Sequence, residues 1–118
     1  MLTGMQHQVG GKYEVVKTSA ANQTWLAQLT ELYSAYSLLS TEEAATAIIM
    51  RGDFRVFYLF QTSGLFGTIY TDTNKNVFAF YLDLANKKVY AGDIRNTLTE
   101  TPNTDTTSQK LTLCRLKN

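Results

Sequence analysis

Charged residues, cysteine, proline and histidine are all scarce in this sequence. Among 118 residues there are 11 Lys and Arg, 10 Asp and Glu, one Cys, one Pro and one His, and the formal net charge is +1. Binding to nucleic acid or to anionic membranes needs a concentrated basic patch, and here the basic residues are scattered. One cysteine cannot form an intramolecular disulfide. We therefore expect no nucleic-acid partner and no disulfide-stapled scaffold.

Residue sets that could support catalysis or metal binding are also missing. No Cys and His cluster has the spacing of a zinc site, and His7, the only histidine, is far in sequence from Cys114. Oxygen ligands from Asp72 to Asp83 resemble a calcium loop, but Val77 stands where such a loop needs glycine. The sequence predicts no metal and no cofactor, and it favours a protein that is not an enzyme.

Long hydrophobic runs are absent as well. Residues 1–11 contain no apolar core of signal-peptide length, and no segment approaches the roughly 20 apolar residues of a membrane span. We expect a cytoplasmic protein or one associated with a virion or another assembly, with an excised piece of a longer chain as the alternative.

One strong helical pattern is present near the N-terminus. Asn22 is a suitable N-cap, and the apolar side chains that follow it are spaced by four, three, four and three residues. This spacing predicts an amphipathic helix of about five turns with one buried stripe. The stripe consists of Trp25, Leu29, Leu32, Tyr36 and Leu39.

A second helix is expected directly afterwards. Ser40 and Glu43 have the spacing of a capping box, in which each side chain bonds the other residue's backbone amide. We expect this helix to continue through Ile48 and Ile49 to Met50, because Gly52 follows as a natural stop.

After the helices the apolar pattern changes to a period of two, which indicates strands. Short turns rich in Gly, Asn and Asp separate them, so an antiparallel meander is predicted. With a first strand at 13–18 and a possible edge strand at 110–116, the chain is expected to form a two-layer α+β sandwich. Its two N-terminal helices would pack on a mainly antiparallel sheet of four to six strands. The expected meander strands are 54–61, 65–71, 77–83 and 88–92.

The expected organisation is a single α+β domain at residues 12–95. A flexible segment at 1–11 precedes it, and a loop or linker rich in Thr and Asn at 96–109 follows it. Residues 110–118 form a C-terminal strand or tail.

Two of the expected strands are apolar on both faces. A sheet with one wet face alternates apolar and polar residues, and two helices can cover only one face. The other face must be covered by the termini, by strong curvature or by another molecule, and exposed aromatic surface commonly marks an interaction site. The candidate interface residues are Phe57, Leu59, Phe78, Phe80, Tyr58 and Tyr81.

These observations favour a non-enzymatic protein-binding or assembly module. It would either self-associate or dock on a larger protein, as a structural subunit or a small inhibitor does, so the expected partner is a protein or a second copy of the chain.

Two alternatives remain open. The order of elements resembles that of cystatin-like and NTF2-like cones, and this resemblance implies a small-ligand or acid–base pocket with Asp83, Asp93 and Trp25 as candidate residues. A helix followed by a four-strand meander also resembles a truncated pilin-like subunit.

Overall fold

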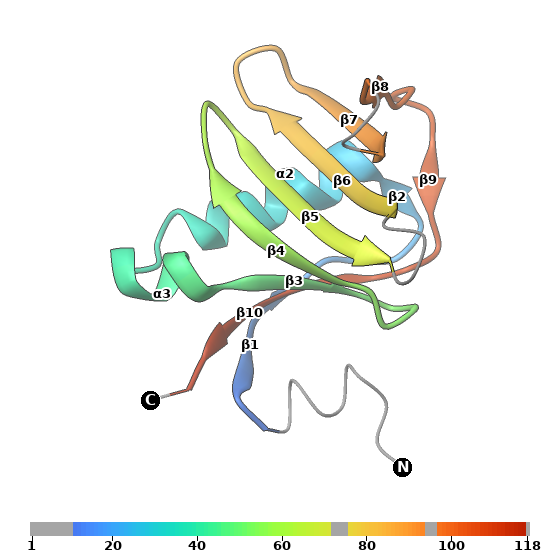
Figure 1. Ribbon diagram of the computed structural model, residues 1–118. Helices are drawn as coiled ribbons and strands as arrows, with labels where there is room; N and C mark the ends of the chain where they lie inside the picture. The colour runs from blue at the N-terminus through green and yellow to red at the C-terminus, as the bar shows by residue number, and fades with distance from the viewer. Residues whose placement is uncertain (1–10, 72–75, 94–96, 118) are drawn as a thin grey trace.

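The computed structural model describes residues 11–71, 76–93 and 97–117 of the chain (Figure 1). It confirms the predicted α+β class, with two helices near the N-terminus packed on an antiparallel sheet. In the described residues the elements are β1 (Tyr13–Thr18), β2 (Gln23–Thr24), α2 (Trp25–Tyr36), α3 (Thr41–Thr46), β3 (Ile48–Arg51), β4 (Val56–Gln61), β5 (Leu65–Thr71), β6 (Asn76–Asp83), β7 (Lys88–Asp93), β8 (Thr99–Glu100), β9 (Thr106–Thr107) and β10 (Leu111–Leu116).

The sheet is larger than the sequence pattern predicts. Within the described ranges, eight strands pair in the order β1-β10-β3-β4-β5-β6-β7-β8, and β2 pairs with β9 in a separate two-stranded sheet. The prediction of four to six strands was therefore too low. β8 and β9 lie in the segment 96–109 that was expected to be a loop, and a backbone bond of 2.8 Å from the Thr101 amide to the Val89 carbonyl helps hold that segment to β7. The predicted flexible segment 1–11 lies almost wholly outside the described residues.

β10 occupies the interior of the sheet, although an edge position was one of the expected outcomes. It pairs with β1 on one side and with β3 on the other, where Cys114 stands opposite Ile48. The four residues from Leu111 to Cys114 are all buried. A strand buried on both faces fits the middle of a sheet, where neighbours satisfy its backbone groups on both sides.

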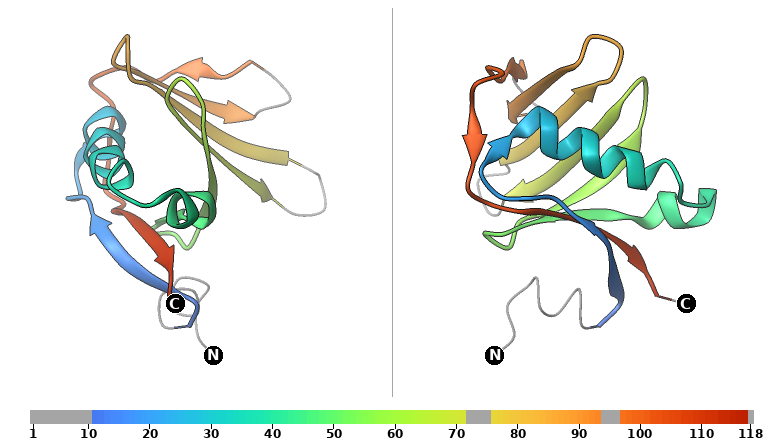
Figure 2. Two further views of the ribbon diagram at one scale, coloured as in Figure 1. Left: turned by 90° about the vertical axis from the view of Figure 1, so that its left-hand side faces the viewer. Right: turned by 180° about the vertical axis from the view of Figure 1, so that it is seen from behind.

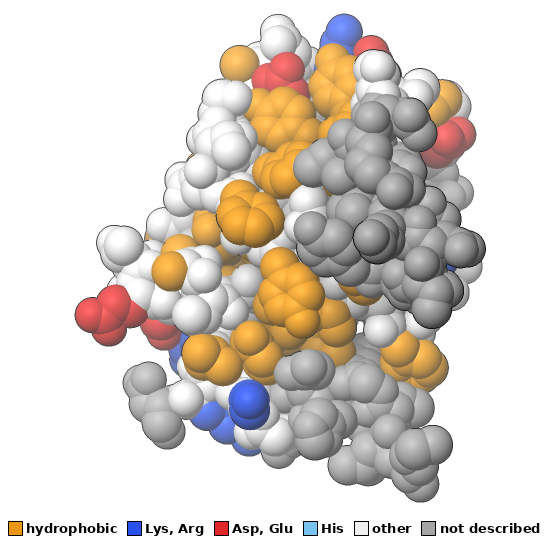
Figure 3. Space-filling view, viewed as in Figure 1, with side chains coloured by type: hydrophobic (Ala, Val, Ile, Leu, Met, Phe, Trp, Pro, Cys, Tyr) orange, Lys and Arg blue, Asp and Glu red, His pale blue; other side chains and the backbone are white. Residues whose placement is uncertain are grey.

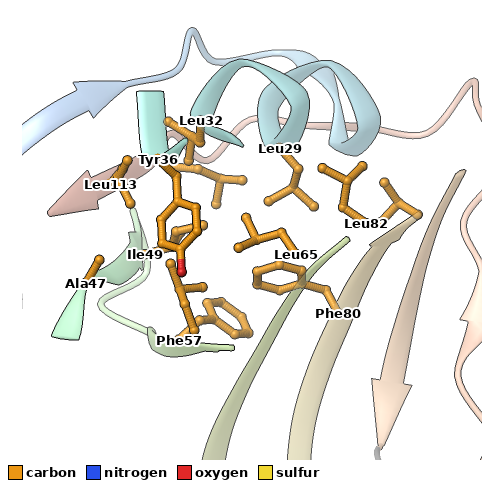
Figure 4. Packing of buried hydrophobic residues seen from close by; sticks show 13 residues of the cluster. Leu29, Leu32, Tyr36, Ala47, Ile49, Phe57, Leu65, Phe80, Leu82 and Leu113 are labelled. Carbon is orange, nitrogen blue, oxygen red and sulfur yellow. The ribbon is translucent and has the colours of Figure 1, made fainter. Parts of the chain in front are cut away.

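Figure 2 shows that the sheet bends around α2, which lies across one face. We call the face turned toward α2 the inner face and the opposite one the outer face. The apolar stripe of α2 meets the inner face, as Figure 4 shows, and Leu29, Leu32 and Tyr36 are 0 to 3% exposed. The sheet side chains that they meet belong to the same buried cluster, which includes Ile49, Phe57, Leu65, Phe80, Leu82 and Leu113.

The start of α2 differs slightly from the expectation. Thr24 is the N-cap, since its Oγ1 accepts a hydrogen bond of 3.0 Å from the Ala27 amide. Asn22, the predicted cap, has a φ of 61° and lies just before β2. The helix therefore begins two residues later than an Asn22 cap requires.

The second helix is short, and its predicted extension to Met50 was wrong. Its capping box is present, with hydrogen bonds of 3.0 and 3.1 Å between Ser40 and Glu43. However, Ile48 to Met50 belong to β3, where all three side chains are at most 1% exposed. β-Branched residues favour strands, and burial on both faces suits a strand between β10 and β4 better than the side of a short helix.

Candidate functional site: a bare aromatic sheet face

Four aromatic side chains form one straight row across the outer face. Phe60 in β4 stands opposite Phe66 in β5, Phe66 stands opposite Tyr81 in β6, and Tyr81 stands opposite Tyr90 in β7. The ring centroids of Phe60 and Phe66 are 6.2 Å apart. The rings of Tyr81 and Tyr90 are stacked, with centroids 6.4 Å apart and planes inclined by 20°. We call these four residues the aromatic row.

The aromatic row faces solvent because both helices lie on the other side of the sheet. Phe60 is 53% exposed and the neighbouring Tyr58 is 54% exposed, while Phe66, Tyr81 and Tyr90 are half-buried. Figure 3 shows the outer face with a band of hydrophobic side chains across the sheet. Contiguous apolar surface of this kind is uncommon on monomeric proteins and commonly marks a contact site.

The polar groups beside the aromatic row are mostly uncharged. Thr68 stands opposite Tyr58, and the Tyr81 hydroxyl shares a hydrogen bond with Ser63. Where the row ends, Glu100 stands opposite Tyr90, and its carboxylate pairs with Lys88 at 3.6 Å. The row itself therefore presents rings and hydroxyl groups without formal charge.

Another part of the outer face is covered. Beside β1, the side chains of Ile48, Met50 and Cys114 are at most 1% exposed, and Tyr13 and Val56 pack against them. Burial raises the pKa of the Cys114 thiol to about 11. The thiol is therefore protonated at neutral pH and is a poor nucleophile. Apolar residues on the outer face of the sheet therefore have two explanations. Near β1 they form a small second core, and on β4 to β7 they form a partly exposed surface.

The six predicted interface residues separate by face. Phe57, Leu59 and Phe80 are 3, 6 and 2% exposed beneath α2, so they are unavailable to a partner in this fold and the prediction is corrected for them. Tyr58 and Tyr81 lie on the outer face.

The sixth residue, Phe78, lies on the inner face but is 44% exposed. Sequence reasoning missed Phe60, Phe66 and Tyr90 as interface residues. For Phe60 a signal was available, because it shares strand parity with Tyr58.

The predicted pocket residues are not brought together. Trp25 lines a pocket of about 270 Å³ on the inner face, whereas Asp83 lines a separate cleft of about 520 Å³ between α2 and the β6–β7 turn. The Asp83 carboxylate accepts a hydrogen bond of 2.8 Å from Nδ2 of the Asn86 side chain and one of 3.2 Å from the Asn86 backbone amide. These bonds lower the pKa of Asp83, which suits a turn-capping carboxylate rather than a general base. The side chain of Asp93 lies outside those described.

A metal site finds no support in the described residues. Over that part of the chain no three His, Cys, Asp or Glu side chains gather in a way that could hold a metal ion.

Neither of the helices in the described ranges has the length and apolar character needed to cross a membrane.

Comparison with known proteins gives no match. No protein-family model fits the chain, and neither a curated protein nor a solved structure is significantly similar to it.

Proposed function

We propose that this protein is a non-enzymatic assembly module that binds a second copy of itself through the aromatic row. The observation that carries this proposal is the directly opposed line of Phe60, Phe66, Tyr81 and Tyr90 on the outer face. Phe60 is exposed, and the other three are half-buried. Aromatic side chains anchor protein interfaces because they bury much surface and lose little side-chain entropy on binding. No enzymatic role is needed to explain the arrangement.

A second copy suits this surface because the surface complements itself. In a two-fold dimer the same patch meets its own image, so a charged patch would repel its partner. The row is uncharged, and the net charge of the chain is only +1. Its polar groups are the hydroxyls of Tyr81 and Tyr90, and the neighbouring Tyr58 adds a third. Hydroxyl groups both donate and accept hydrogen bonds. Such groups can pair with identical groups across a two-fold axis.

The test is the solution mass as a function of protein concentration, measured by light scattering or sedimentation. We expect the mass to approach twice 13.3 kDa and Phe60→Glu to weaken association at least tenfold, because it places a charge in an interface of anchoring rings. Leu38→Glu is the matched control, since Leu38 is 87% exposed between the two helices.

Two results would overturn the proposal. One is a monomer at every concentration up to about 1 mM, which corresponds to a binding free energy weaker than about −4 kcal/mol. The other is an equal loss of association in Leu38→Glu and Phe60→Glu, because the effect would then be one of charge alone and not of the aromatic row. Circular dichroism of both variants checks that the fold is retained.

A further inference from the structure

The inner face holds a small aromatic pocket that the self-association proposal does not use. The pocket has a volume of about 270 Å³ and lies where the first turn of α2 meets β3, β4, β6 and β7. For scale, a dry apolar cavity of about 150 Å³ accommodates benzene. The space therefore suits one aromatic ring with a short substituent. Its side-chain walls include Trp25, Phe57, Phe78, Phe80, Ala91 and Arg51.

One arginine lines this pocket, and a second packs on one of its wall residues. The Arg51 guanidinium lines it and lies 5.7 Å from the centroid of the Trp25 ring. The Arg55 guanidinium lies 4.3 Å from the centroid of Phe78, which forms part of the pocket wall. Cations placed over aromatic rings are attracted by the ring quadrupole. The same two cations make the pocket unfavourable for a positively charged ligand.

The arginines share a single carboxylate. Asp53 accepts a hydrogen bond of 3.0 Å from Arg51 Nε and pairs with Arg55 Nε at 3.2 Å. In the described part of the chain no other acidic side chain forms an ion pair with either arginine. Among the described side chains, two positive charges and one negative charge leave the cluster with one net positive charge.

The guanidinium that packs on Phe78 has one nitrogen with an unmet hydrogen-bonding capacity. Arg55 Nη1 is buried and has no hydrogen-bond partner among the described residues. A buried donor without a partner is costly, more so when it carries charge. An acceptor oxygen supplied by a ligand would remove that cost through a charge-assisted hydrogen bond.

We propose that this pocket binds a small aromatic carboxylate. The ring occupies the space beside Trp25 and Phe78, and the carboxylate is held by Arg51 and Arg55. A monoanion matches the single net positive charge of the cluster, whereas the second negative charge of a dianion such as phosphate has no counter-charge there. The apolar walls favour a ring over an inorganic ion.

Trp25 provides a direct readout, because it is the only tryptophan in the chain and it lines the pocket. The probe is phenylacetate, and its uncharged counterpart phenylacetamide is the control. We expect phenylacetate to produce a saturable change in tryptophan emission with a Kd of about 1 mM or tighter, a reasonable affinity for a ligand of this size. Phenylacetamide should bind at least tenfold more weakly.

Two arginine variants test the role of the charge. Arg55→Gln should weaken phenylacetate binding about tenfold and leave phenylacetamide binding unchanged, while Arg55→Lys should restore part of the affinity. A linear, non-saturating fluorescence response, equal affinity for the acid and the amide, or inorganic phosphate competing as well as phenylacetate would each overturn the proposal. Circular dichroism confirms that the variants fold. The pocket at Trp25 and the aromatic row lie on opposite faces of the sheet, so failure of this proposal leaves the self-association proposal standing.

Discussion

The two faces of β4 and β6 carry similar side chains in opposite environments. Phe57 is 3% exposed and the next residue, Tyr58, is 54% exposed. In β6, Phe80 is buried and Tyr81 is only half-buried. Successive residues of a strand point to opposite faces, so the position of α2 alone decides which aromatic ring becomes core. Similar chemistry therefore supplies folding free energy on the inner face and binding capacity on the outer face.

The largest expected difference between the faces is in stability. Phe80→Ala should lower the free energy of unfolding by about 3–5 kcal/mol, since it leaves a cavity against α2. Phe60→Ala should change the unfolding free energy by about 0.5 kcal/mol or less, because that ring already faces water. Urea unfolding at a concentration where the monomer dominates measures both values, and equal losses would show that the outer ring is also part of the core.

A smaller effect on the free energy of unfolding should appear at alkaline pH, and it should arise from Cys114 in the covered part of the outer face. Burial raises the pKa of Cys114 from 9.0 to about 11, so the unfolded state loses its thiol proton first as the pH rises. The stabilising effect of the neutral thiol is therefore complete below pH 9 and should fall by roughly 2–3 kcal/mol by about pH 11. Cys114→Ala should remove this part of the pH dependence. Unfolding titrations at several pH values test it, and identical slopes for both proteins would contradict a dry environment at Cys114.

The smallest expected effect compares two neighbours on β5. A Cβ atom added at Gly67 would lie 2.5 Å from the Phe80 ring, so Gly67→Ala should destabilise by about 2 kcal/mol through overpacking of the inner face. Thr68 stands on the outer face opposite Tyr58, and Thr68→Ala should cost less than about 1 kcal/mol. Thermal unfolding of both variants measures the difference. A similar melting temperature for the two would mean that the inner face can expand to accept a methyl group.

The sequence predicts the local elements well. The helical stripe that begins at Trp25 follows from its spacing, and the meander follows from its turns. The helix is shorter than the predicted five turns, because it ends at Tyr36 and leaves Leu39 beyond it. The strand Ile48–Arg51 could not be separated from a helix, because a short apolar run fits either element and only burial between β10 and β4 decides. The place of β10 between β1 and β3, and the two-residue strands β8 and β9, depend on pairing between distant segments that no local pattern reveals.

The candidate site was less predictable than the fold. The aromatic row requires the register of four strands, which places Phe66 between Phe60 and Tyr81. Alternation in the sequence identifies two aromatic faces but cannot say which one α2 covers, and for this reason Phe57 and Phe80 were taken as interface residues. Trp25 was suggested as a pocket residue together with Asp83 and Asp93 but without Arg51, because Ile48 to Met50 were expected to end a helix rather than to form β3.

The position of β10 between β1 and β3 implies that two parts of the sheet form at different rates during folding. Hairpins from β4 to β7 join neighbouring segments and can form early. In contrast, β1 gains its sheet neighbour only when β10 arrives, and the Glu14 and Arg115 side chains that pair across this junction are 101 positions apart. Closing so long a loop carries an entropic cost before any contact compensates for it. Docking of β10 between β1 and β3 is therefore the expected rate-limiting event, and until it occurs β3 has an unpaired edge open to other chains.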